Sequence, residues 1–437
     1  MRLTVIGTGY LGATHAACMA ELGYEVLGYD VDEVKISALQ SGKVPFYEPE
    51  LPELLARHVA GGRVAFTTDI DEVANFGDVH FLCVGTPQQP NGYAADLRYV
   101  HAAIETLAPR LRRPCLVVGK STVPVGTATT LATRIAELAP AGADVELAWN
   151  PEFLREGFAV RDTLRPDRLV IGVQTSRAER VLREIYAPLL DAGVPLVVTD
   201  FPTAELVKTA ANAFLATKIS FINAMAEICE VVGADVVQLS EALGYDPRIG
   251  KRFLQAGLGF GGGCLPKDIR AFRARAEELG AAEAVAFLAE VDAINMRRRA
   301  RVVELARREC GGDFTGRRVA VLGAAFKPNS DDIRDSPALE VAETIRRAGA
   351  HVSVYDPEAM PNAAARYPQL DYAKTAFAAC ENADVVLHLT EWQEFREIDP
   401  AALGEIVAQR RIIDGRNVLD PNLWRAAGWM YRGLGRP

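Results

Sequence analysis

The sequence predicts an α/β protein in which two doubly wound domains are joined by a long central helix. Three patterns support this prediction. Short apolar runs alternate with helix-length segments through residues 1–200, and an unbroken helical pattern follows from Thr203 to about Val232. The last third of the 437-residue chain then repeats strand-and-turn motifs of its first third. A chain of this length is expected to form two or three domains rather than one.

The first part of the chain contains five apolar runs with the length of buried strands. They are Leu3–Ile6, Glu25–Tyr29, Val79–Val84, Leu116–Gly119 and Leu169–Val173. The segments between them are long enough for crossover helices, and strands joined by such helices run parallel. Parallel sheets are covered on both faces, so their strands are apolar throughout, as these runs are. We therefore expect a parallel, doubly wound domain over residues 1–200.

The middle of the chain is predicted to be helical, over residues 201–300. Pro202 precedes the long helical pattern, where proline suits the start of a helix. Apolar residues at i, i+3 and i+4 spacing then continue to about Val232. We expect the apolar stripe of this helix to form the interface of a homodimer or a higher homo-oligomer.

The C-terminal part, residues 310–437, is predicted to be a second domain of the first kind. The matched segments are Arg318–Gly323 with Leu3–Gly7, Val352–Asp356 with Val26–Asp30, and Ala383–His388 with Gly77–Leu82. The second copy has Lys327-Pro328-Asn329 in place of a glycine-rich turn, so it is expected to bind something other than a dinucleotide. Two Rossmann-like domains flanking a helical middle is the resulting architecture.

The segment from Gly7 to Gly12 matches GxGxxG, follows a strand and opens a helix, as a dinucleotide-binding turn does. Asp30 ends the next strand about 20 residues later, where a carboxylate binds ribose hydroxyls. No arginine follows it to accept a 2′-phosphate, which favours NAD over NADP. A glycine turn without a ligand is the alternative. Lys35 either reaches the cofactor or is a solvated helix lysine.

Cys264 lies behind a run of glycines and is followed by Lys267 and Asp268. Glycines let another backbone or a ligand approach closely. The thiolate is the nucleophilic form of cysteine, and a nearby cation favours it. A reactive thiol in a chain with a dinucleotide-binding turn indicates an oxidation that passes through a covalent thioester.

Three further groups of polar residues are candidates for the site. Lys208 and Asn212 lie four residues apart on the long helix, and Lys208 has apolar neighbours. A partly buried lysine has a shifted pKa, although a lysine stem crossing an apolar seam gives the same pattern. Glu152 and Glu156 follow a short strand; they are ligand-binding carboxylates or solvated loop acids. Ser121 and Thr122 close another strand.

Composition narrows the class of function. The net charge of −9 argues against a nucleic-acid surface. The seven cysteines show no CxxC pair and no Cys/His metal spacing, so we expect no metal site, and their number fits a reducing cytoplasm. The chain begins directly with a strand, and no apolar run reaches the length of a membrane span. We therefore expect no nucleic-acid or membrane partner.

With these motifs in order, the whole chain resembles the UDP-glucose 6-dehydrogenase family, within the UDP-glucose/GDP-mannose dehydrogenase superfamily. The likeness is carried by long segments spread over the sequence. They are Gly7–Gly12, Val84–Pro87, Ser121–Pro124, Asn150–Gly157, Glu205–Asn212, Phe260–Asp268 and Ala325–Ser336.

The resemblance implies two successive oxidations of the sugar C6 hydroxyl with two NAD, through a Cys264 thiohemiacetal and thioester. It implies that Lys208 stabilises the C6 oxyanion, Asp268 handles a proton with a water, and Glu152 is the acid/base for hydrolysis. Thr122 and Asn212 fix the water and the hydroxyl.

By the same resemblance, NAD contacts are expected from Gly7, Gly9, Tyr10, Leu11, Gly12, Asp30, Lys35, Thr86, Thr122, Glu156, Lys267 and Arg334. Nucleotide-sugar contacts are expected from Glu152, Phe153, Leu154, Arg155, Lys208, Asn212, Arg248, Phe253, Leu254, Gln255, Ala256, Gly257, Gly261, Lys327 and Arg416. In this family, the arginine that matches Arg248 commonly comes from a neighbouring subunit.

Other functions remain as alternatives. GDP-mannose 6-dehydrogenases share the cysteine, the lysine and a similar Asn150–Glu156 segment, whereas Pro166–Gly172 resembles the UDP-glucose group. N-acetylhexosamine dehydrogenases usually carry histidine before the cysteine, where this chain has Gly263. A nucleotide-sugar-binding regulator would not require Cys264, Lys208 and Glu152 together. A hydroxyacid dehydrogenase has no use for Cys264 or for a second Rossmann-like domain.

Overall fold

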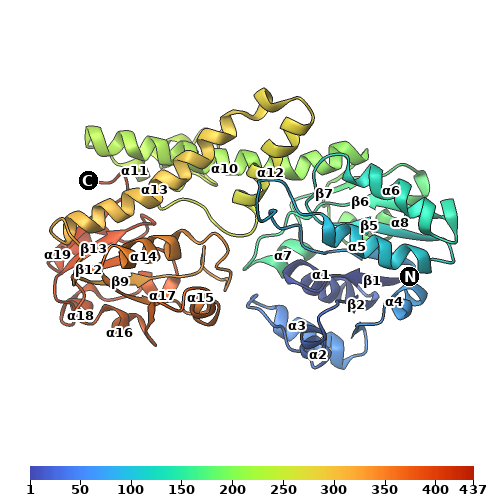
Figure 1. Cartoon of the computed structure of the whole chain (residues 1–437), viewed down its shortest axis with the longest axis horizontal. Helices are drawn as coiled ribbons and strands as arrows, with labels where there is room; N and C mark the ends of the chain where they lie inside the picture. Colours follow the sequence, from blue (N-terminus) through green and yellow to red (C-terminus); the bar gives the residue numbers. More distant parts are fainter. The chain divides into compact units, whose positions relative to one another are not determined.

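The computed structural model describes residues Met1–Pro437 and divides into two compact units. One unit comprises residues 1–211 and 270–280, and the other comprises residues 212–269 and 281–437. Two of the three divisions fall within helices, α10 (Phe201–Val232) and α12 (Leu265–Glu278), and the third follows Gly280. Each unit is built on one mainly parallel sheet. The predicted α/β class, with two doubly wound domains and a long central helix, is confirmed (Figure 1).

The first unit contains an eight-stranded sheet in the order β3-β2-β1-β4-β5-β6-β7-β8. The strands are β1 (Arg2–Ile6), β2 (Glu25–Tyr29), β3 (Val64–Thr67), β4 (Val79–Leu82), β5 (Cys115–Gly119), β6 (Val145–Trp149), β7 (Leu169–Gly172) and β8 (Leu196–Thr199). All five predicted strands are present. The one exception to the parallel prediction is the β6–β7 pair, where Trp149 lies antiparallel to Gly172.

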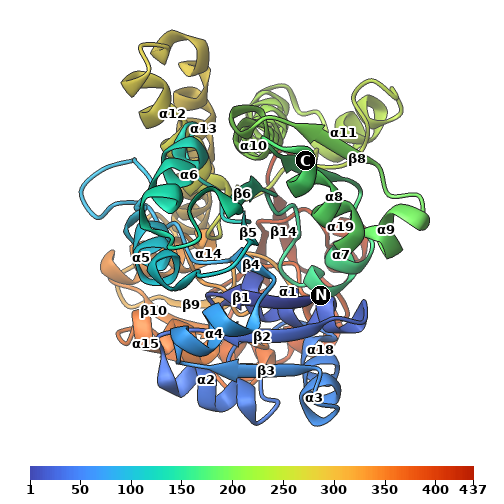
Figure 2. The same cartoon turned by 90° about the vertical axis from the view of Figure 1, so that its right-hand side faces the viewer.

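Helices cover both faces of this sheet, as the apolar strands predict. Successive side chains of a strand point to opposite faces, so Leu3 and Val5 join one core and Ile6 joins the other. Figure 2 shows α1, α7 and α8 on one side of the strands and α4, α5 and α6 on the other. The helices of this unit are α1 (Tyr10–Glu21), α2 (Glu33–Gln40), α3 (Leu51–Ala60), α4 (Ile70–Phe76), α5 (Arg98–Leu107), α6 (Thr127–Leu138), α7 (Ala159–Leu164), α8 (Ser176–Ile185) and α9 (Ala187–Asp191).

The second unit contains a six-stranded parallel sheet in the order β11-β10-β9-β12-β13-β14. Its strands are β9 (Arg318–Leu322), β10 (His351–Tyr355), β11 (Asp371–Tyr372), β12 (Val385–His388), β13 (Arg411–Asp414) and β14 (Met430–Gly433). The three strands predicted from the internal repeat are β9, β10 and β12, and they are adjacent. The helices are α11 (Val236–Gly244), α13 (Phe287–Glu309), α14 (Pro337–Arg347), α15 (Met360–Arg366), α16 (Ala376–Cys380), α17 (Gln393–Arg396), α18 (Pro400–Gly404) and α19 (Pro421–Ala426).

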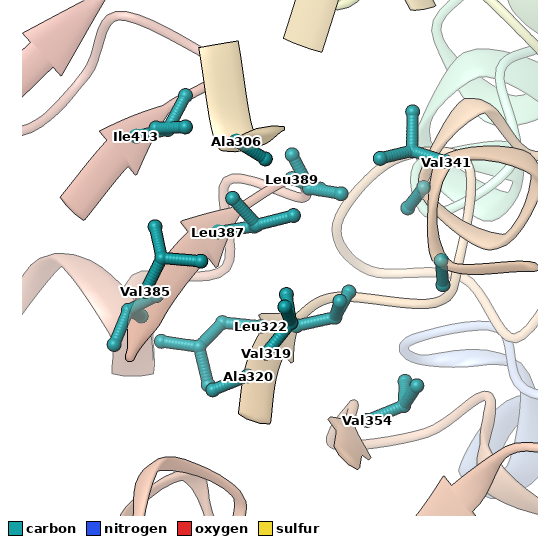
Figure 3. Packing of buried hydrophobic residues seen from close by; sticks show 14 of the residues in the cluster. Ala306, Val319, Ala320, Leu322, Val341, Val354, Val385, Leu387, Leu389 and Ile413 are labelled. Atoms are coloured by element: carbon teal, nitrogen blue, oxygen red, sulfur yellow. The ribbon is translucent and has the colours of Figure 1, made fainter. Parts of the chain in front are cut away.

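The core of the second unit lies between β9, β12 and their covering helices. Figure 3 shows Val319 of β9 and Leu387 of β12 in the same cluster as Ala306 of α13 and Val341 of α14. All four side chains are almost completely buried. This packing fixes the strand ends from which the loops of the unit project.

The long helix α10 begins at Phe201 and ends at Val232, so it starts two residues earlier than the pattern predicts. Pro202 therefore lies inside its first turn, where the N–H groups of a helix have no intrahelical acceptor and the missing N–H of proline costs no hydrogen bond. None of the helices combines the length and the apolar character needed to cross a membrane.

Candidate active site

The turn between β1 and α1 has the geometry of a phosphate-binding loop. Gly7 has a φ of +90°, which a residue with a side chain rarely adopts. A Cβ on Gly12 would lie 1.7 Å from the carbonyl oxygen of Gly7, so the strand and helix pack too closely for any other residue. A Cβ on Gly9 would meet nothing within 4 Å, and no side chain caps the α1 N-terminus there. Open space thus lies beside Gly9 at this helix start, where a pyrophosphate binds in dinucleotide-binding turns.

Asp30 follows β2 beside this turn and is 9% exposed. Its carboxylate accepts hydrogen bonds from the Thr8 amide at 2.9 Å and from Lys35 Nζ at 2.8 Å. Burial opposes ionisation of Asp30, but the hydrogen bonds from Lys35 and Thr8 outweigh it and lower its pKa below the usual value. Asp30 is thus an ionised acceptor placed where ribose hydroxyls bind in this fold. The residues of the turn, Asp30 and Lys35 fit NAD.

More of the predicted residues gather at the carboxyl ends of β4, β5 and β6, where ligands bind in open α/β sheets. The Thr86 hydroxyl donates to the Thr122 carbonyl oxygen at 2.8 Å, which ties the loops after β4 and β5 together. The Ser121 hydroxyl likewise donates to the Val84 carbonyl oxygen at 2.7 Å. After β6, Glu152 folds back so that its Oε1 accepts the Phe153 and Leu154 amides, at 2.6 and 2.8 Å.

Lys120 is a residue of this edge that the sequence analysis did not single out. It follows β5 directly, and its side chain is 3% exposed. Lys120 Nζ lies 3.2 Å from Glu152 Oε2 and donates to Asn150 Oδ1 at 3.0 Å. The Tyr186 hydroxyl donates to the same Asn150 oxygen at 2.6 Å. A charged residue placed directly after a fully apolar strand was the signal available in the sequence.

Other predicted residues of this unit are placed differently. Lys208 of α10 is partly buried, with Nζ 5.4 Å from the Phe153 ring centre. Arg155 is paired with Asp162 at 2.7 Å, and its side chain is 52% exposed. Lys208 and Phe153 therefore share one surface, whereas the Arg155 guanidinium is already held by a carboxylate.

In the second unit, Cys264 is exposed and directly precedes α12. Its carbonyl oxygen accepts the Asp268 amide at 2.9 Å, which places Cys264 at the N-cap of that helix. Negative charge is stabilised at a helix N-terminus, and a thiolate there is favoured. The other six cysteines are buried, and burial raises the pKa of Cys83 and Cys380 to about 12. Cys264 is therefore the one accessible thiol.

Asp268 links three of the predicted residues. It is 2% exposed, and Asn212 of α10 donates its side-chain amide to Asp268 Oδ2 at 2.6 Å. Lys267 Nζ lies 2.5 Å from the other oxygen, Oδ1. The carboxylate is thus oriented by a neutral donor and by a cation, one turn of helix beyond Cys264.

The glycines before Cys264 are explained by the loop that precedes α14. A Cβ on Gly261 would lie 2.2 Å from the Asp335 carbonyl oxygen, and one on Gly263 would lie 2.3 Å from the Arg334 guanidinium carbon. The Gly262 amide donates to the Arg334 carbonyl oxygen at 2.8 Å. Arg334, predicted from the sequence, is therefore beside Cys264. The side chain of Arg334 is 56% exposed and is also paired with Asp332 at 2.6 Å.

Most of the predicted nucleotide-sugar residues of this unit lie in the loop from Phe253 to Gly261. The Leu258 amide donates to the Gly415 carbonyl oxygen at 2.7 Å, so this loop is bound to the segment after β13. Arg416 donates to the carbonyl oxygens of Gly259 and Leu389, at 2.9 and 2.7 Å. Lys327 Nζ lies 5.4 Å from the centre of the Phe326 ring.

Of the loop residues themselves, Leu254, Ala256, Gly257 and Gly261 are buried, whereas Gln255 is exposed. Phe253 has a positive φ of 65°. Arg248 stands apart from this group: its side chain is 87% exposed and is paired only with the nearby Asp246. Arg248 therefore stands apart from the loop residues of this unit.

Comparison with known proteins matches three successive parts of the chain to one family. Residues 1–190 match the NAD-binding domain of the UDP-glucose/GDP-mannose dehydrogenase family, residues 202–297 its central domain, and residues 320–421 its UDP-binding domain. The UDP-glucose 6-dehydrogenase of Rhizobium meliloti is 44% identical over 439 residues and is covered completely, as is this chain.

Solved structures agree in fold. A UDP-glucose dehydrogenase from the archaeon Pyrobaculum islandicum superposes with a TM-score of 0.91 at 39% identity, covering 100% of this chain and 98% of its own. A GDP-mannose dehydrogenase from Pseudomonas aeruginosa gives a TM-score of 0.55 at 27% identity, with 99% and 100% coverage.

Proposed function

The chain belongs to the UDP-glucose/GDP-mannose dehydrogenase family, and we propose that it oxidises the C6 hydroxyl of UDP-glucose twice to give UDP-glucuronate. The observation that carries this proposal is the exposed Cys264 at the start of α12, one helical turn before the buried Asp268. Identity favours UDP-glucose over GDP-mannose, since it is 44% and 39% to dehydrogenases named for UDP-glucose and 27% to the one named for GDP-mannose.

The cofactor is NAD. When NAD is bound, it accepts the hydride that leaves C6. We assign its pyrophosphate to the turn from Gly7 to Gly12 and its ribose hydroxyls to Asp30 and Lys35. Further contacts are proposed for Thr86, Thr122, Glu156, Lys267 and Arg334.

We assign a distinct role in the proposed reaction to each of Lys208, Asp268 and Cys264. Lys208 stabilises negative charge on the C6 oxygen as its proton leaves, and Asp268 takes up that proton through a water. The Cys264 sulfur then adds to the aldehyde carbon, and the carbonyl oxygen becomes the hydroxyl of a thiohemiacetal. Loss of the hydroxyl proton and of the C6 hydride, which a second NAD would accept, leaves a thioester.

Hydrolysis of the thioester is assigned to Glu152. Its carboxylate takes a proton from water as the water oxygen bonds to C6 and the C–S bond breaks, which releases the carboxylic acid and the Cys264 thiolate. The acid then loses its proton to water. Asn212 and Thr122 hold the hydroxyl and the water. Both Glu152 oxygens are already hydrogen-bonded within the chain, so the carboxylate is held in one orientation.

We propose that residues 1–200 bind NAD, that residues 201–300 supply the helical and dimerisation domain, and that residues 310–437 bind the nucleotide. The sugar and diphosphate contacts are assigned to Phe153, Leu154, Arg155, Lys327, Arg416 and the loop from Phe253 to Gly261. The exposed Arg248 fits a residue that completes the site of a second copy. We also propose a homodimer and a cytoplasmic location.

The test is the number of NADH molecules formed per UDP-glucose consumed, with GDP-mannose and UDP-N-acetylglucosamine offered separately. We expect two NADH per UDP-glucose from the native protein. The Cys264→Ala variant is expected to stop before the thioester, so it forms fewer than two. One NADH per sugar from the native protein would overturn the thioester route, and turnover on GDP-mannose alone would change the assigned substrate.

A further inference from the structure

The feature that the proposed reaction leaves unexplained is the buried cation of Lys120. Its side chain is 3% exposed at the carboxyl end of β5. Removing an ammonium group from water is costly unless it is paired, so a lysine here requires a partner. Its neighbours are Glu152 Oε2 at 3.2 Å and Asn150 Oδ1 at 3.0 Å.

Asn150, one of the two partners of Lys120, is itself held in place by further hydrogen bonds. Asn150 accepts from both Lys120 and the Tyr186 hydroxyl through Oδ1, and its amide donates to the Val170 carbonyl oxygen at 2.8 Å. Asn150 and Tyr186 are 1% and 3% exposed. The Lys120 ammonium is therefore fixed by residues that follow β6 and α8, and it can act on Glu152 from a constant position.

The other titratable groups facing Lys120 are neutral at neutral pH. Burial raises the pKa of Cys83 to about 12 and raises that of Tyr186. Burial, with the Lys120 charge, lowers the pKa of His15 well below its usual value. For Lys120 itself, burial disfavours the charged form, but the Glu152 carboxylate opposes this, and the pKa of Lys120 is raised. Among these groups, the Glu152 carboxylate is the one that can balance the charge of Lys120.

We propose that Lys120 is a positioning residue that holds Glu152 for thioester hydrolysis, which rests on the role proposed above for Glu152. The Phe153 and Leu154 amides fix Oε1, and the Lys120 ammonium fixes Oε2. The Glu152 side chain is still 19% exposed, so the carboxylate can meet water. The carboxylate is the form that accepts a proton from water.

The experiment compares Lys120→Met, Glu152→Gln and the double variant in the full-length chain with UDP-glucose and NAD. For Lys120→Met we expect kcat to fall at least about tenfold, while KM for UDP-glucose changes less than about threefold. Hydrolysis becomes the slow step, so mass spectrometry after an acid quench should show sugar bound to Cys264. The double variant should be no slower than Glu152→Gln, because residues that act through one another are not additive.

Lys374→Met removes an exposed lysine of the second unit and serves as the matched control, with unchanged kcat. If Lys120→Met does not fold, Lys120→Gln keeps an N–H donor and removes the charge in the same way. Losses that multiply in the double variant, or a Lys120 variant without bound sugar, would overturn the proposal. A native protein that never forms the adduct would remove the proposed function itself, and the role of Lys120 with it.

Discussion

At the scale of single residues, each buried charge in this protein is held by identified donors or by a counter-charge. Asp268 is held by Asn212 and Lys267, and Asp30 is held by Thr8 and Lys35. Glu205 of α10 accepts the Gly126 and Ala128 amides at the start of α6, at 2.8 and 2.7 Å. A carboxylate in a sequence motif can therefore be structural, and its partners decide which role it has.

Asp30 gives a prediction at this scale. Its lowered pKa means that it is ionised at neutral pH, so it can accept hydrogen bonds from ribose hydroxyls. Hydrogen bonds to a charged group contribute roughly 1.5–3 kcal/mol, so Asp30→Ala should raise KM for NAD at least about tenfold. KM for UDP-glucose should change little, as steady-state kinetics would show. Asp191→Ala, at an exposed position of the same unit, is the control. An unchanged KM for NAD would contradict the assignment of Asp30.

At the scale of elements, α14 shows how a helix surface responds to pH. Glu343 lies three and four residues before Arg346 and Arg347, with contacts of 2.8 and 2.6 Å. Hydrogen bonds from Arg346 in particular lower the pKa of Glu343 from 4.5 to about 2. Because the folded pKa is the lower one, the ionised carboxylate stabilises the fold above about pH 4.5. That contribution is lost as the pH falls from 4.5 towards 2.

Glu343→Gln should therefore lower the unfolding temperature at pH 7 and have almost no effect near pH 2. The expected loss at pH 7 is small, about 1 kcal/mol or less, because Arg347 is exposed, Arg346 is partly exposed, and water screens the pairs. Thermal unfolding followed by circular dichroism at both pH values measures it. The exposed Glu381, changed to glutamine, is the control. An effect of equal size at both pH values would show that Glu343 acts through packing and not through its charge.

At the scale of the whole molecule, α10 carries an apolar stripe that the chain itself leaves exposed. Phe214, Phe221 and Ile228 are spaced by seven residues and are 65%, 49% and 54% exposed. Residues seven apart lie on one face of a helix. Large exposed apolar patches mark interaction sites, and this stripe supports the homodimer proposed above.

Phe221→Glu places a charge in the middle of that stripe. If two copies pair there, we expect the dimer dissociation constant to rise at least about 100-fold, because an unpaired charge would be buried. Analytical ultracentrifugation measures the change. Leu423→Glu, at a 55% exposed position of α19, should leave the dimer intact. A native protein that sediments as a monomer would remove the dimer proposal, and a Phe221→Glu dimer would place the interface elsewhere.

Much of the fold was predictable because it depends on local patterns. Apolar runs such as Val79–Val84 become buried parallel strands, and the GxGxxG turn requires glycine where Gly12 packs against Gly7. The repeat of strand and turn motifs at Arg318 also predicts a second sheet. The edge strand β8 was not predicted although its sequence, LVVT, is mostly apolar, because a short apolar run does not by itself distinguish a strand from other buried segments.

The sequence by itself determined the two-sheet architecture, the dinucleotide turn and the placement of Cys264 behind glycines, because each follows from spacing along the chain. Only the tertiary structure decided that Lys120 pairs with Glu152 and that Asn212 bonds to Asp268, which lie 32 and 56 residues apart. It also decided that Gly261, before Cys264, lies against the backbone of Asp335. Contacts between distant segments depend on how sheets and helices pack, and no local pattern specifies that packing.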